Sequence, residues 1–173
     1  MQTQTQQARL VDPILAEMDQ EAEITKRLFD IIPEDKLSWR PHPKAKSLGE
    51  LAMHIAGLQG LVAELCRPDT IEMPVIPPDP EASSRAEARE TLDNNLRKAK
   101  EIVNATDDAQ ATAEFTITKN GTVLMAMPRI AFWRSILLNH NYHHRGQLST
   151  YLRQLDVPLP SIYGPSADAN PFA

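Results

Sequence analysis

Histidines are the residues in this chain whose spacing points to chemistry. His140 and His144 lie four residues apart in a helical segment, and His54 lies in another such segment. Residues four apart share one face of an α-helix, so this pair could hold one ion between two imidazoles. A third imidazole from a facing helix would complete a three-histidine site for one divalent metal, with coordination positions left open. Imidazole favours zinc, nickel, cobalt or ferrous iron over calcium or magnesium.

The apolar pattern around these histidines predicts that they face the core. His140 and His144 fill, at helical spacing, the gap between Leu137 and Leu148 in an apolar stripe, and His54 interrupts a second stripe in the same way. A single inward histidine is more often a hydrogen-bonded core residue, and a pair four apart is common by chance. Three together favour a metal, because three buried imidazoles without an ion would need several hydrogen-bond partners in an apolar bundle.

Two further residues are weaker candidates for catalysis, and each has an alternative role. His143 lies about 100° around the helix from His144, where it is either a general base beside the site or an edge residue bonded to solvent. Glu50 precedes His54 by one helical turn. It is either a carboxylate that orients this histidine or the second half of a capping box that begins at Ser47.

The elements that must position these residues are helical. Four segments carry apolar residues at spacings of three and four, with proline clusters among the breaks between them. We predict helices at residues 7–32, 47–67, 85–105 and 128–155, a proline-rich connection at 71–84 and an irregular tail at 156–173. Runs of Thr, Val and Ile flank Asn120-Gly121, which predicts a short β-hairpin between the third and fourth helices. The pattern favours an all-α fold, a four-helix bundle with at least one crossover connection.

Composition narrows the class of protein. A chain of 173 residues, 42% hydrophobic, predicts a single domain over residues 1–173. The net charge of −5, without a basic face, argues against nucleic acid as a partner. The first ten residues lack the features of a signal peptide, and no apolar stretch approaches the roughly twenty residues that span a membrane. A single cysteine, Cys66, fits a reducing compartment. We predict that this residue is packed as a small side chain and is not a nucleophile. The sequence therefore predicts a soluble cytoplasmic protein without a membrane partner.

Two stretches resemble the DinB-like superfamily of metal-binding four-helix bundles. They are DKLSWRPHPKAKSLGELAMHIAGL and NHNYHHRGQLSTYLRQLDVPLPSIYGPSADAN, and with the order of the helices the resemblance covers essentially the whole chain. It implies an up-down-down-up bundle, often a homodimer, whose metal is held by one histidine of the second helix and an HxxxH pair of the fourth. These map onto His54, His140 and His144, with zinc or nickel as the expected ion. Within the HRGQ stretch, Gly146 is expected to allow close approach of another helix and Gln147 to bond across the bundle.

The resemblance also suggests an activity. The superfamily includes YfiT-like metal-dependent hydrolases and the S-transferases that use bacillithiol or mycothiol. The expectation is a metal-dependent enzyme, such as a transferase acting with a low-molecular-weight thiol on a small-molecule substrate. The alternatives are a metal-dependent hydrolase and a non-catalytic dimeric module in which the ion joins two helices.

Overall fold

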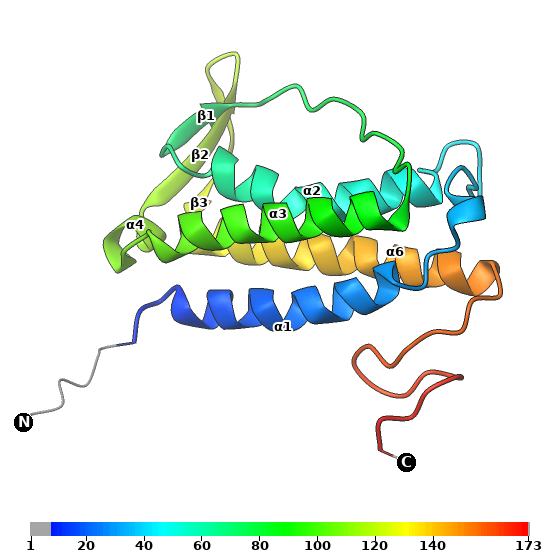
Figure 1. Ribbon diagram of the computed structural model, residues 1–173. Coiled ribbons are helices and arrows are strands. Elements are labelled where there is room, and N and C mark those ends of the chain that lie inside the picture. Colours follow the sequence, from blue (N-terminus) through cyan, green and yellow to red (C-terminus); the bar gives the residue numbers. More distant parts are fainter. Residues whose placement is uncertain (1–7, 173) are drawn as a thin grey trace, which may run out of the picture.

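The computed structural model describes residues 8–172 and is mostly helical with a small sheet. Four long helices lie side by side in these residues (Figure 1): α1 (Asp12–Phe29), α2 (Leu48–Leu65), α3 (Arg85–Asn104) and α6 (His140–Gln154). Figure 1 shows α1 and α6 running in one direction and α2 and α3 in the other. The predicted start of the first helix, residue 7, lies outside the described residues. None of the described helices is long and apolar enough to cross a membrane.

The second helix begins where local side-chain chemistry fixes its first turn. The Ser47 hydroxyl accepts a hydrogen bond from the backbone N–H of Glu50 at 3.1 Å, and the Glu50 carboxylate accepts one from the Ser47 N–H at 2.6 Å. This reciprocal capping box satisfies two backbone donors that the helix itself leaves without partners. It also fixes where α2 starts, and hence the position of His54, which lies one turn after Glu50.

The predicted fourth helix runs without a gap from Arg129 to Gln154, but it is not α-helical throughout. It comprises α5 (Arg129–Phe132), the π-helical segment η2 (Trp133–Asn139) and α6. A π-turn takes in one more residue than an α-turn, so the helical spacing counted from Leu137 does not carry across to the histidines. The buried positions of α6 are Asn141, Arg145, Leu148 and Leu152. The predicted core-facing placement of His140 and His144 is therefore wrong in detail, because both lie half-buried beside this face.

The sheet is larger than the predicted hairpin. Strands β2 (Glu114–Lys119) and β3 (Thr122–Pro128) pair antiparallel around Asn120 and Gly121, whose φ angles of 51° and 77° match the expected tight turn. A further strand, β1 (Thr70–Glu72), pairs parallel with β2 and gives the order β1-β2-β3. Two other short elements were not predicted, the 3₁₀ helix η1 (Glu34–Lys36) and α4 (Asp108–Thr112).

The core consists of two apolar clusters with a polar layer between them. One cluster lies toward the sheet and includes Phe115 and Trp133, and the other lies toward the opposite end and includes Phe29. The polar residues that lie between the clusters along α1 and α6 are Glu21, Thr25, Asn141 and Arg145, all buried. The histidines of α6 are neighbours of this layer in the sequence.

Candidate metal centre

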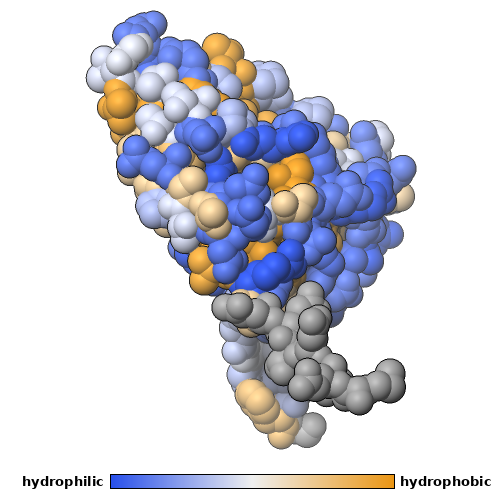
Figure 2. All heavy atoms as spheres, turned by 90° about the vertical axis from the view of Figure 1, so that its left-hand side faces the viewer, coloured by the Kyte–Doolittle hydropathy of each residue, from blue (hydrophilic) through white to orange (hydrophobic). Residues whose placement is uncertain are grey.

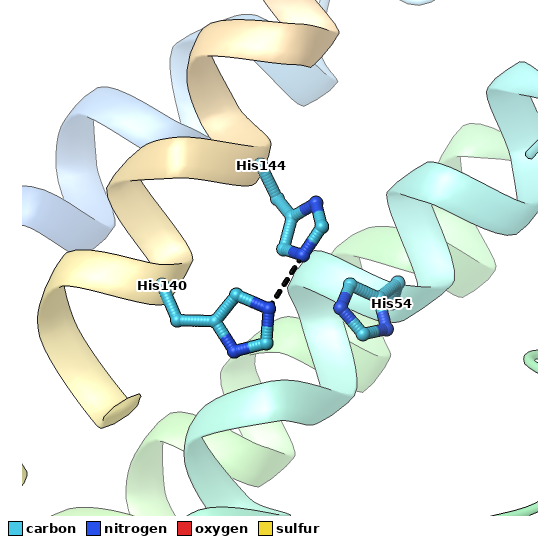
Figure 3. Close-up of side chains that lie close together, drawn as sticks. All are labelled: His54, His140 and His144. Carbon is cyan, nitrogen blue, oxygen red and sulfur yellow. Dashed lines mark hydrogen bonds between the residues drawn. The ribbon is translucent and has the colours of Figure 1, made fainter. Parts of the chain in front are cut away.

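Three imidazoles converge between α2 and α6. Figure 3 shows His54 reaching across from α2 toward His140 and His144 on α6. The ring centroid of His144 lies 4.3 Å from that of His54 and 4.5 Å from that of His140, and the third pair is 5.6 Å apart. Each residue offers a ring nitrogen within 4.8 Å of those of the other two. The three predicted ligands are thus brought to one place.

Hydrogen bonds indicate which ring nitrogen of each histidine is available. The Nδ1 atom of His54 lies 3.0 and 3.2 Å from the two carboxylate oxygens of Asp79, and Nδ1 of His144 lies 2.7 Å from the amide oxygen of Gln147. These oxygens only accept, so both Nδ1 atoms carry a proton, and in the neutral rings both Nε2 atoms keep a lone pair. The Nε2 atom of His54 is buried and has no hydrogen-bond partner among residues 8–172.

The contact between His140 and His144 also indicates that the cluster has ring nitrogens with available lone pairs. Nε2 of His144 lies 2.7 Å from Nε2 of His140, and no more than one proton can lie between them. Two ring nitrogens with lone pairs and a third beside them form a donor set suited to a divalent transition metal. The residues present therefore fit the ion that the sequence predicts.

The surroundings of His140 and His144 favour the neutral form of these two imidazoles, which is the form that binds a metal. Burial, with the neighbouring histidines, lowers the pKa of His144 to about 4. Burial also lowers the pKa of His140, and the charges of the other histidines act in the same direction. Burial alone would raise the pKa of Asp79, but its contacts with Lys46 and His54 outweigh this and lower it.

The carboxylate that contacts His54 is not the predicted one. Glu50 accepts from the Ser47 backbone and lies 3.5 Å from the Arg40 guanidinium, so its observed role is the capping box. Asp79 takes the position expected of Glu50, although it lies 25 residues from His54 in the chain. The sequence offered one indication, an acidic residue between prolines in the connection that leads from the second helix to the third.

The other residues singled out from the HRGQ stretch and its neighbour lie at the surface. His143 is exposed, with its ring centroid 4.9 Å from that of His144. Gln147 bonds His143 and His144 of its own helix, not a residue across the bundle. A side chain at Gly146 would meet open space, so close helix approach does not explain this glycine. Both expectations for Gly146 and Gln147 were wrong.

A buried ion pair next to the histidines was not predicted. The Arg145 guanidinium donates to the carboxylate and, at 3.0 Å, to the backbone carbonyl of Glu21 on α1, and it also contacts the Tyr163 hydroxyl. The side chains of Arg145 and Glu21 are only 2% and 7% exposed. An apolar stripe gives no indication of such a pair. Since Arg145 directly follows His144, it fixes this turn of α6 against α1.

A cavity of about 740 Å³ lies away from the histidines, at the end of the bundle that carries the sheet. Cys66, Arg129 and Trp133 contribute to its lining. The buried Arg129 is already bonded to the Cys66 carbonyl at 2.7 Å and to Asp69 at 2.6 Å. Burial raises the pKa of the Cys66 thiol to about 12, which agrees with its predicted structural role. Figure 2, which views this end, shows small hydrophobic areas separated by hydrophilic side chains. We therefore place the candidate site at the histidines.

The fold and the site together define a class of protein, a helical bundle with a three-histidine cluster between two of its helices. The sequence matches the DinB superfamily over residues 17–148, and the chain belongs to that superfamily. It is 24% identical to the uncharacterized protein YrdA of Bacillus subtilis over an alignment of 163 residues, and this alignment covers 91% of this chain and 90% of YrdA.

Two solved structures share the fold. A DinB-like protein from Bacillus cereus has a TM-score of 0.67 at 22% identity, over 86% of this chain and 95% of its own. The DinB-like protein YjoA from Bacillus subtilis has a TM-score of 0.64 at 18% identity, over 84% and 92% of the two chains.

Proposed function

We propose that this protein binds one divalent transition metal, zinc or nickel, through His54, His140 and His144. The observation that carries the proposal is the buried Nε2 atom of His54, which has no partner among the described residues and lies beside the two histidines of α6. A histidine kept only for packing would leave this atom unsatisfied, at a cost of about 1–3 kcal/mol. A bound ion would use the lone pair.

We further propose that the metal serves catalysis in a transferase that acts with a low-molecular-weight thiol. The metal would supply Lewis acidity, which lowers the pKa of a thiol or water that binds in an open coordination position. All three histidines are half-buried and not enclosed in the core, which is compatible with the approach of a small molecule to the ion. The protein's own thiol at Cys66 is buried with a raised pKa, so the nucleophile would have to come from a co-substrate.

Hydrolysis is the second candidate, and the position of His143 favours it. This histidine is exposed beside His144, where it could accept a proton from an attacking water. In either reaction, the proposal includes the up-down-down-up bundle order, assembly as a homodimer and a cytoplasmic location. A metal that only joins α2 and α6 is the non-catalytic alternative, which the experiments below distinguish.

Metal binding is tested first. Purified wild-type protein should retain zinc or nickel in elemental analysis, and added metal should raise its thermal stability because the ion binds the folded state. His140→Ala should abolish this rise. His42→Ala is the matched control, because His42 is exposed in the loop before α2 and is not part of the cluster. The proposal fails if wild type and His140→Ala respond equally to both metals.

Activity is tested next on the metal-loaded protein. Low-molecular-weight thiols with a general electrophile are compared with ester and amide substrates. Thiol transfer that persists in Cys66→Ala supports the transferase, whereas hydrolysis that falls in His143→Ala supports the second candidate. Tight metal binding with neither activity would support the non-catalytic alternative.

A further inference from the structure

The connection between β1 and α3 reaches the candidate metal centre at a single acidic residue. Residues 73–82 form neither helix nor strand, and Figure 1 shows them passing along α2. Within this stretch, Asp79 is the residue that bonds a histidine of the cluster. Its carboxylate is 23% exposed and its oxygen Oδ2 accepts from both Lys46, at 2.6 Å, and His54, at 3.0 Å.

The chain holds this carboxylate in place from both sides. Pro78 and Pro80 flank Asp79, and proline fixes its own φ and restricts the residue before it. Two residues later, Glu81 accepts hydrogen bonds from the hydroxyls of Ser38, at 2.6 Å, and Ser47, at 2.8 Å. The connection is thus stiff around Asp79 and anchored at the start of α2.

A glycine in the first turn of α2 permits this close approach. A Cβ atom at Gly49 would lie 2.8 Å from Cγ of Glu81 and 3.1 Å from the backbone nitrogen of Ala82. Real Cβ atoms essentially never lie as close as 2.8 Å to another atom, and 3.1 Å is tighter than most contacts, so a larger residue would force the Glu81 side chain and the backbone of the connection to shift. The glycine at position 49 therefore leaves room for the segment that carries Asp79 to pack against α2.

We infer that Asp79 is a positioning residue of the metal site and that it couples metal binding to the docking of the connection. By accepting from Nδ1 of His54, the carboxylate holds this ring in the tautomer whose Nε2 is free to bind the ion, and it increases the basicity of that nitrogen. Coupling is reciprocal. A metal bound to His54 would therefore hold residues 73–80 against the bundle more firmly. This inference rests on the proposed metal site.

The first test compares metal affinities. Asp79→Ala removes the acceptor, Asp79→Asn keeps a neutral acceptor, and Glu50→Gln is the matched control. Glu50 also lies near His54 in sequence but bonds the Ser47 backbone, and glutamine preserves the capping box. Calorimetric titration with zinc should show affinity weakened about 10- to 100-fold in Asp79→Ala and less in Asp79→Asn. Affinity in Glu50→Gln should stay within about twofold. Far-UV circular dichroism checks that each variant is folded.

Two further readouts address the mechanism. In metal-free wild-type protein, ¹⁵N NMR should find the proton of His54 on Nδ1, and Asp79→Ala should shift the tautomer balance toward Nε2–H. Zinc should slow amide hydrogen exchange at Val75, Ile76 and Asp79, which are non-proline residues of this stretch, in wild type, and at Val75 and Ile76 it should have no such effect in Asp79→Ala. Equal zinc affinity in wild type and Asp79→Ala would overturn the inference while leaving the metal site standing. A wild-type protein that binds no metal would overturn both.

Discussion

The buried pair of Glu21 and Arg145 leads to a quantitative prediction about stability. Glu21→Gln keeps the size of the side chain and one oxygen acceptor but removes the negative charge. Arg145 then remains 2% exposed, with the Glu21 backbone carbonyl and neutral side-chain groups as its partners. Loss of one partner from a buried ion pair costs about 3–5 kcal/mol, since the other charge stays buried. Because these neutral acceptors remain, we expect Glu21→Gln to lower the free energy of unfolding by about 3 kcal/mol, the lower end of this range.

Urea denaturation, followed by circular dichroism at the helical band, measures this cost. A domain of this size has an m-value of about 2 kcal/mol per molar urea, so the midpoint should fall by about 1.5 M with an unchanged m-value. Total stability of about 5–15 kcal/mol leaves the variant folded in water.

Glu17→Gln is the matched control. Glu17 is also on α1 and accepts at 2.6 and 2.5 Å from Arg134, whose side chain is 45% exposed. An exposed pair is worth about 0–1 kcal/mol, so the urea midpoint should fall by less than about 0.5 M. Equal losses in Glu21→Gln and Glu17→Gln would refute the reasoning that burial sets the cost.

Three further predictions follow from the described contacts. Cys66 in the native protein should react with a thiol reagent only in denaturant, because burial raises its pKa to about 12; rapid labelling of the folded protein at pH 8 would contradict this. Ser47→Ala should cost about 1–2 kcal/mol in urea denaturation, since it removes the helix cap and the contact with Glu81, whereas Ser47→Thr should cost less. The pKa of His144 is lowered to about 4, so the unfolded chain binds more protons between pH 6.5 and 4. Metal-free protein should therefore lose stability as pH falls through this window, and His144→Gln should lose less.

The parts of the fold that could be predicted from sequence are those specified by neighbouring residues. Ser47 and Glu50 form the expected capping box, and Asn120-Gly121 forms the expected turn. Each depends on side chains within a few positions, whose chemistry is visible in the sequence. The helical majority of the fold follows in the same way from apolar spacing.

The parts that could not be predicted depend on partners far apart in the chain. Strand β1 has three residues and is defined by its pairing with β2. Each residue of β1 pairs with the residue 46 positions later in the chain. Asp79 and His54 are 25 residues apart, and Glu21 and Arg145 are 124 apart. Spacing within one helix specifies none of these contacts. The three histidines were singled out because two share a helix face and the third interrupts an apolar stripe, and the family resemblance pointed to the same residues.

The π-helical segment η2 gives the last helix two independent rotational phases. One residue corresponds to about 100° of rotation and 1.5 Å of rise in an α-helix, and a π-turn absorbs one such residue. The sheet end, with Trp133, and the histidine end, with His140 and His144, are therefore aligned separately with their neighbours. If all seven residues of Trp133–Asn139 were instead wound as regular α-helix, one end would turn by about 100° relative to the other, and the helix could keep its apolar packing or its histidines opposite His54, but not both.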